Sequence, residues 1–162
     1  MAATAADLFA RFNELGIETT TIEHPPLNTV EESRNLRGDL PGGHCKNLLL
    51  RDKKKRNWLI VTLEDKAVDL KSLPDKIGAG RLSFASADRL WEYLAVKPGS
   101  VTPFALINDP EQKVQVVLDE DMLAHDLLNY HPLENTATTA IKRDDLLKFI
   151  NACGHLAMTV KI

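Results

Sequence analysis

The sequence has few cysteines, few aromatic residues, no surplus of basic charge and no long apolar run. Its two cysteines, Cys45 and Cys153, lie far apart, which excludes a disulfide framework and favours a reducing compartment. The best apolar run, Trp58 to Leu63, is far shorter than the roughly 18 residues that span a membrane. The first residues lack the basic start and unbroken apolar core of a signal peptide. We therefore expect a cytoplasmic protein that contacts no membrane.

The charge balance limits the partners. With 20 basic and 23 acidic residues the formal net charge is −3, whereas proteins that coat duplex DNA carry a basic surplus. Aromatic residues make up 6% of the chain, too few for a base-stacking platform. DNA is therefore not expected as a partner. Any contact with nucleic acid must be local, and one concentrated basic run is available, at residues 51–56.

Length and patterning predict one α+β domain over residues 1–162. A chain of this size buries roughly 70% of its unfolded surface and needs no metal or disulfide to fold. Helical spacing and capping residues predict helices at 4–15, 29–38, 66–71, 73–77, 86–94, 122–128 and 144–153. Alternation and β-branched runs predict strands at 17–23, 47–52, 58–63, 104–108, 114–118, 136–141 and 155–162. The intermixed order favours a mixed sheet, with 47–52 and 58–63 as one antiparallel hairpin and 104–108 and 114–118 as another.

Few residues offer obvious chemistry. The five histidines are scattered, and the adjacent His44 and Cys45 would point to opposite faces of a strand, so no metal site is expected. Cys45 lies beside His44 and Lys46, a setting that can activate a thiol, although a small half-buried residue is the favoured interpretation. No Gly-x-Ser-x-Gly elbow is present. Residues 78–80 lack the rest of a dinucleotide or phosphate-loop pattern.

Lys46 and the loop at residues 99–103 are better candidates. Lys46 follows the turn at residues 41–43 and precedes an apolar run, although a lysine at the start of a strand is more often a surface residue. The loop has the pattern Gly-x-x-x-Pro and leads into an expected buried strand. Such a loop can present free backbone N–H groups toward a pocket, as an oxyanion requires, or it can simply connect two elements.

Several motifs together resemble one family. They are His24-Pro25-Pro26 with Thr29-Val30-Glu31-Glu32, then residues 43–48, 83–86, 99–104 and 131–139, in the family's order along nearly the whole chain. The chain resembles the freestanding aminoacyl-tRNA deacylases related to the editing insertion of bacterial prolyl-tRNA synthetase, which include the YbaK-type proteins. It is most similar to the branch that clears alanine from mischarged tRNA(Pro).

The resemblance implies a single α+β domain with a central mixed, barrel-like sheet flanked by helices. It also implies hydrolysis of the ester at the acceptor end of a mischarged tRNA, without a cofactor, by positioning and oxyanion stabilisation. The chain is too short to include a synthetase core, so editing would act in trans, with prolyl-tRNA synthetase as a possible partner. The residues implied for catalysis are Lys46, Gly99, Ser100, Val101 and Thr102.

The resemblance also supplies a substrate pocket and leaves its specificity open. The pocket residues are expected to be Ile22, Leu27, Asn47, Phe84, Pro103, His131, Asn135, Thr136 and Thr138. The basic residues Lys53, Lys54, Lys55 and Arg56 are candidates for contacts with tRNA phosphates, although a solvated hairpin tip is the favoured alternative. Cys-tRNA(Pro), Ser-tRNA and Thr-tRNA remain alternative substrates, and a non-catalytic module that binds tRNA or a synthetase is an alternative from another class.

Overall fold

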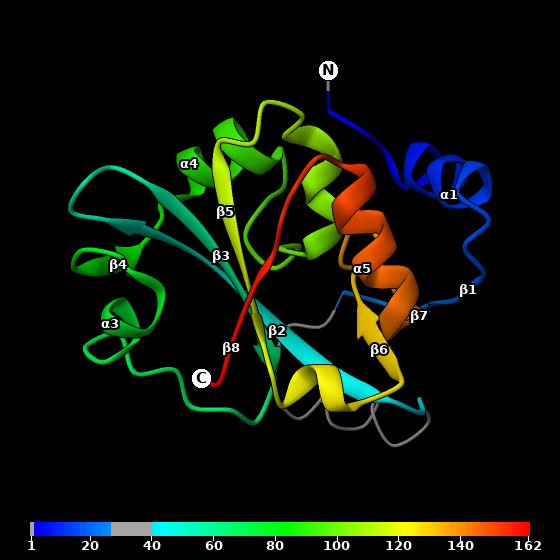
Figure 1. The fold of residues 1–162 in the computed structure, drawn as a ribbon. Helices are drawn as coiled ribbons and strands as arrows, with labels where there is room; N and C mark the ends of the chain where they lie inside the picture. The colour runs from blue at the N-terminus through cyan, green and yellow to red at the C-terminus, as the bar shows by residue number, and fades with distance from the viewer. Residues whose placement is uncertain (1, 27–39) are drawn as a thin grey trace.

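The computed structural model describes residues 2–26 and 40–162 (Figure 1). Its strands are β1 (Thr19–Glu23), β2 (Gly43–Asp52), β3 (Asn57–Leu63), β4 (Leu82–Phe84), β5 (Val114–Asp119), β6 (Leu127–Tyr130), β7 (Ala137–Lys142) and β8 (Met158–Val160). Its helices are α1 (Ala5–Glu14), α3 (Leu73–Ile77), α4 (Ala87–Leu94) and α5 (Arg143–Ala152), with 3₁₀ turns η1 (Pro103–Asn108) and η2 (Met122–Ala124). The helix expected at 29–38 and the pocket residue Leu27 lie outside the described residues.

The strands form one mixed sheet in the order β1-β7-β6-β2-β3-β5-β8, with β4 paired to β2 off this path. β2 is antiparallel to β3 and β4 and parallel to β6, while β3, β5 and β8 run parallel to one another. β1, β7 and β6 are joined by antiparallel pairs. The α+β class with a mixed sheet is therefore confirmed, and so is the hairpin formed by β2 and β3.

The main core lies where the two halves of the sheet face each other. Both Leu128 and Ile141, from β6 and β7, and Leu59, from β3, belong to the same buried cluster, so the sheet must curve around it. Phe12 of α1 and Phe149 of α5 close this cluster, with ring centroids 5.3 Å apart. In Figure 1, α1 and α5 lie on one side of β2, β3 and β5, and α3 lies on the other, beside β4.

Capping residues begin the helices where the sequence predicts. The Thr4 hydroxyl accepts from the amide of Asp7 while the Asp7 carboxylate accepts from the amide of Thr4, which completes a capping box. Ser86 caps α4 with a single bond, in which its hydroxyl accepts from the amide of Arg89. Helical spacing groups Trp91 with the buried Leu90 and Leu94 of α4, but Trp91 is 53% exposed. No helix in residues 2–26 and 40–162 is long and apolar enough to cross a membrane.

The second hairpin predicted from the sequence is wrong. Residues 103–108 form η1 rather than a strand, because Thr102 caps the turn, Pro103 begins it and residues 104–106 are buried in the main core. β5 consequently has no antiparallel partner there and lies parallel to β3, with Val114 opposite Asn57. The Asp109 carboxylate, which accepts from the amides of residues 113 and 114, fixes the turn between η1 and β5.

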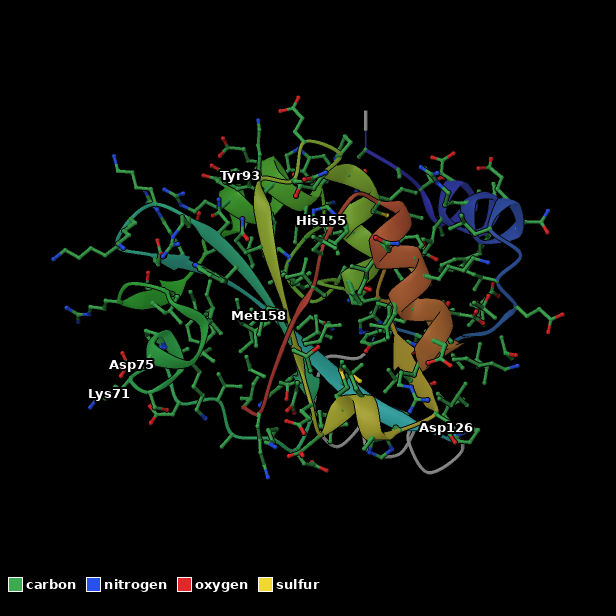
Figure 2. The ribbon with its side chains drawn as sticks, in the orientation of Figure 1. Lys71, Asp75, Tyr93, Asp126, His155 and Met158 are labelled. Carbon is green, nitrogen blue, oxygen red and sulfur yellow. The ribbon has the colours of Figure 1, made fainter. Side chains whose placement is uncertain are left out.

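Three other expected elements also differ. The helix expected at 66–71 is irregular chain that ends in a turn at 70–72, where the Asp69 side chain accepts from the amide of Lys71. The helix expected at 122–128 is one 3₁₀ turn followed by β6, since Leu128 and Tyr130 enter the core with the alternation of a strand. The last strand shortens to β8, because His155 is held by Asp109 at 2.9 Å between α5 and β5 (Figure 2).

One buried carboxylate organises the tip of the β2–β3 hairpin. Asp52 accepts from the amides of Lys54 and Arg56 at 2.9 Å each, and from the Trp58 indole at 3.1 Å. It also accepts from the Arg56 guanidinium at 2.9 Å and from the Gly80 amide at 3.4 Å. Burial alone would raise the pKa of Asp52, but these donors together lower it to about 2.

Asp52 is therefore expected to link stability to pH. Its folded pKa lies below the unfolded value of 3.8, so its contribution is complete above about pH 4 and is lost as the pH falls toward 2. We expect Asp52→Asn to lower the free energy of unfolding at pH 7 by about 1–3 kcal/mol and to flatten its decline below pH 4. Urea unfolding of both proteins at several pH values measures this, and parallel pH curves would contradict it.

Candidate active site

The segment that joins β6 to β7 brings several predicted residues together. The side-chain nitrogen of Asn135 lies 3.7 Å from the position that a Cβ would take on Gly99. The Nδ1 atom of His131 is 3.0 Å from the carbonyl oxygen of Ala137, and its ring centroid is 6.4 Å from that of His24. The loop at 99–103 and the end of β1 therefore meet this segment from two directions.

Paired residues of β1 and β7 form one wall of a cavity of about 930 Å³. Ile22 lies opposite Thr138, and both line this cavity together with Asn129 and Pro41. Ile22 is 39% exposed, so its side chain is accessible from the cavity. The volume is that of a site for a small organic molecule. Asn129 and Pro41 were missed by the sequence analysis because neither lies in a recognisable motif.

The threonines of the β7 region have different environments. Thr138 lines the cavity, and its hydroxyl is 2.8 Å from Nε2 of His24. The hydroxyl of Thr139 points to the opposite face, where it bonds to that of Thr21 at 2.8 Å. Thr136 is exposed and its carbonyl accepts from the amide of His24. Thr138 is thus the only residue from 136–139 among the described residues that line this cavity.

Lys46 and Asn47 have side chains on opposite faces of β2. Lys46 lies opposite Thr62, and Asn47 lies opposite Val61, which belongs to the main core. The Asn47 side-chain oxygen is buried and has no hydrogen-bond partner in the described part of the chain. Lys46 follows the last β2–β6 pair by two residues on β2, and His131 follows the same pair by two residues, just after the end of β6. Both therefore lie where the two strands diverge.

Only part of the loop at 99–103 has free amides. The amide of Ser100 donates to the carbonyl of Lys97 at 3.0 Å, and the Thr102 hydroxyl accepts from the amide of residue 104. Within residues 2–26 and 40–162, the amides of Gly99, Val101 and Thr102 donate to no acceptor. Gly99 has a φ of +89°, a conformation that side chains strain, and Pro103 is buried at the first position of η1.

Phe84 and the basic run lie away from this cavity. Phe84 is on β4 opposite Leu50 and is 64% exposed. Arg56 is engaged within the fold, because its guanidinium donates to Asp52 and to the Gly78 carbonyl at 2.9 Å each. The remaining basic residues of the run, at 53–55, are exposed at the hairpin tip.

Neither cysteine has the environment of a nucleophile. Burial raises the pKa of the Cys45 thiol to about 12, even though the Tyr130 hydroxyl and the Asn129 amide partly oppose this effect. Burial also raises the pKa of Cys153, to about 11. A thiol with a raised pKa contains little thiolate at neutral pH. The described residues contain no group of three His, Cys, Asp or Glu side chains that could hold a metal ion.

Histidine tautomers fix the polarity near the cavity. Burial lowers the pKa of His131, the Ala137 carbonyl partly opposes this, and His24 nearby adds to the lowering. Since Nδ1 of His131 faces that carbonyl, a neutral ring carries its proton there and leaves Nε2 as an acceptor. His24 belongs to the site by these contacts. The sequence analysis quoted it within a motif but did not assign it a role.

Comparisons with known proteins identify the family to which the chain is similar. The model of the family described as the aminoacyl-tRNA editing domain matches residues 24–149. The prolyl-tRNA editing protein ProX of Acetoanaerobium sticklandii is 39% identical over 156 residues, which cover 96% of this chain and 95% of that protein. Prolyl-tRNA synthetase associated domain-containing protein 1 of Mus musculus is 39% identical over 155 residues, covering 93% and 91%. A solved structure provisionally assigned as a trans-editing enzyme for prolyl tRNA synthetase has a TM-score of 0.74 at 20% identity, covering 100% and 99%.

The fold and these matches define a class. The chain belongs to the aminoacyl-tRNA editing domain family. It is an enzyme of the aminoacyl-tRNA deacylase class, a hydrolase that serves translation fidelity. The family and the enzyme class predicted from the sequence are both confirmed.

The buried thiol predicts that Cys45 is dispensable for hydrolysis. Cys45→Ala should keep kcat/KM for a mischarged tRNA within about threefold of wild type, because a neutral buried thiol cannot attack an ester. Deacylation assays with purified protein measure this. Iodoacetamide at pH 8 should also label Cys45 far more slowly than a free thiol. A loss of activity beyond a hundredfold, in a variant of unchanged stability, would restore the thiol mechanism.

Proposed function

We propose that the protein hydrolyses mischarged alanyl-tRNA(Pro) in trans to prolyl-tRNA synthetase. The names of the two relatives refer to prolyl-tRNA editing and to association with prolyl-tRNA synthetase, and both are covered over at least 91% of their length. The observation that carries the proposal is the meeting of Gly99, Asn135, His131 and His24 at one end of β6 and β7. The loop with free amides thereby lies beside the polar side chains of the segment that joins β6 to β7.

Backbone amides stabilise the oxyanion in this proposal. The amides of Val101 and Thr102 are the donors for the carbonyl oxygen of the ester as it gains negative charge. The amide of Ser100 is occupied by Lys97 and so contributes to loop shape rather than to catalysis. An aminoacyl ester is already reactive, so orientation and charge stabilisation suffice without a protein nucleophile.

Lys46 supplies a fixed positive charge near the acceptor end. Its compact ammonium suits the phosphate of the terminal adenosine or the edge of the ester. Lys46 lies where β2 and β6 diverge. It comes two residues after the last β2–β6 pair, as His131 does on the other chain segment. The vicinal ribose hydroxyl of the tRNA then activates the attacking water, as the family resemblance implies. No cofactor takes part in this mechanism.

One end of the cavity, rather than its whole volume, limits the size of the amino-acid side chain that binds. About 930 Å³ holds far more than an alanyl group, so the remainder is available for the terminal adenosine. Ile22 and Thr138 face each other across β1 and β7 and form the candidate wall that limits the side chain. A synthetase pocket rejects a residue lacking one methylene by only about 1–3 kcal/mol, so a second pocket is needed for accuracy.

A serine- or threonine-charged tRNA is the second candidate substrate. The Thr138 hydroxyl lines the cavity and supports recognition of a polar side chain. The hydroxyl of Thr139 is turned away and engaged with Thr21, which weakens the argument from the threonine-rich segment as a whole. Alanine is therefore favoured, since the Ile22 wall is apolar.

A panel of charged tRNAs tests the substrate and Lys46 together. Purified wild-type protein should hydrolyse Ala-tRNA(Pro) with a kcat/KM at least tenfold above that for Ser-, Cys- or Pro-tRNA(Pro). Lys46→Ala should lose at least tenfold on Ala-tRNA(Pro), because the charge that positions the acceptor end is removed. Its free energy of unfolding should change by less than about 1 kcal/mol, since Lys46 is not fully buried.

Lys71→Ala is the matched control, because Lys71 is exposed beside α3, away from β6 and β7 (Figure 2). Equal activity in Lys46→Ala and Lys71→Ala would remove Lys46 from the mechanism. Wild-type protein that hydrolyses none of the four esters would instead favour a module that only binds tRNA or a synthetase.

The exposed hairpin tip is proposed to contact tRNA phosphates. Lys53, Lys54 and Lys55 are exposed, and the Cβ that Gly80 lacks would lie 3.4 Å from the Cβ of Lys53. Arg81, which follows Gly80, is exposed beside the same tip. Four cationic side chains thus project from a tip that the Asp52 carboxylate holds in one shape.

Salt dependence distinguishes phosphate binding from solvation of the tip. The double variant Lys53→Ala, Lys54→Ala should raise KM for charged tRNA and reduce the slope of log(kcat/KM) against log[salt] by about 1 to 2. The value of kcat should stay within about twofold, because the tip is distant from the ester. Titrations at several salt concentrations measure the slope. A slope identical to that of wild type would show that the lysines of the hairpin tip do not contact tRNA phosphates.

A further inference from the structure

The orientation of the Thr138 hydroxyl is fixed by its neighbour His24. Nδ1 of His24 lies 2.8 Å from the carbonyl oxygen of Pro25, and a carbonyl can only accept, so Nδ1 carries the ring proton. With the ring proton on Nδ1, Nε2 is the ring atom that can accept. The Thr138 hydroxyl lies 2.8 Å from this Nε2, and therefore it donates its single proton to His24.

The hydroxyl can then act only as an acceptor toward any further partner. Thr138 is 8% exposed and lines the cavity beside Ile22, while its proton is held by His24. His131 has the same polarity, since its Nδ1 faces the Ala137 carbonyl and leaves Nε2 unprotonated. The Thr138 hydroxyl, which belongs to a residue lining the cavity, and the His131 ring, whose centroid is 6.4 Å from that of His24, therefore both offer acceptors. A ligand group that fits must bring donors.

We propose that His24 is a positioning residue, which turns the Thr138 hydroxyl into an acceptor for the α-ammonium of the aminoacyl ester. The inference rests on the proposed deacylase function and specifies what that site requires of its substrate. An ammonium brings three donors and no acceptor, so it matches these acceptors, whereas a hydroxyl that donated outward would repel it. Hydrogen bonds to a charged group are among the stronger ones in proteins.

The substrate class follows from this polarity. An aminoacyl-tRNA carries a free ammonium beside the ester, whereas an N-acylated or peptidyl ester carries a neutral amide with one donor. The pair formed by His24 and Thr138 therefore favours free aminoacyl esters and disfavours growing peptides attached to tRNA. This distinction concerns the α-nitrogen alone and is separate from the choice between alanine and a larger side chain.

The test compares alanyl-tRNA(Pro) with propionyl-tRNA(Pro), in which hydrogen replaces the α-ammonium. Each enzymatic rate is divided by the uncatalysed rate of the same ester, since the ammonium itself makes the ester more labile. Wild type should prefer the alanyl ester, and Thr138→Val should reduce that preference about tenfold or more by removing the acceptor. Thr138→Ser keeps the hydroxyl and should retain most of the preference.

Variants of His24 test the positioning role. His24→Leu leaves the Thr138 hydroxyl free to rotate and should reduce the preference several-fold, through kcat/KM for the alanyl ester. His24→Gln offers an amide oxygen near the position of Nε2 and should restore part of it. A purely structural role predicts equal losses on both esters and no rescue by glutamine, and that result would overturn the proposal.

Thr139→Val is the matched control, because it removes a hydrogen-bonded hydroxyl from the opposite face of the same strand. It should leave the alanyl preference unchanged, and urea unfolding gives the stability cost of each threonine change. If Thr138→Val and Thr139→Val alter the preference equally, the inference fails. If wild type hydrolyses neither ester, the proposed function itself fails, so the two failures are distinguishable.

Discussion

The fold depends on β2, which forms backbone hydrogen bonds with three other strands. It pairs with β3 along most of its length, with β4 near its end and with β6 near its start. Leu49 and Leu50 are both buried, one in each of the two hydrophobic clusters, so each face of the strand packs against a core. A shift by one residue would exchange these faces and expose both clusters. The register of β2 is therefore the constraint that sets the position of every other strand.

The candidate site occupies the region where that constraint ends. β2 and β6 stay paired for only two residues and then diverge, and polar segments gather at the divergence rather than more sheet. The chemistry of the family suits such a place. An ester that is already activated needs backbone donors, a cation and a correctly oriented hydroxyl, all of which a gap between strands can hold without a deeply buried nucleophile.

Local signals predicted those parts of the fold that local energies decide. Thr4 and Ser86 mark helix starts because a cap is formed within a few residues, and the β2–β3 hairpin follows from alternation across a polar tip. Residues 104–108 and 127–130 were mistaken because short apolar runs have no distinctive period, and tertiary packing decides between turn, helix and strand. Family resemblance supplied Ile22 and Thr138 as pocket residues, but their shared cavity is a consequence of register. His24 was missed because its contact with Thr138, 114 residues away in sequence, forms only when β1 and β7 are paired.

The hydrogen-bond network around the Asp52 carboxylate has a consequence for molecular recognition. Backbone amides, an indole and a guanidinium all converge on one carboxylate, so the tip of the hairpin is ordered before any partner arrives. Flexible basic segments lose conformational entropy when they bind a polyanion, and that loss subtracts from affinity. Here the backbone beneath the lysines has already been ordered by folding. Only the lysine side chains remain to be immobilised, which lowers the entropic cost of binding a polyanion.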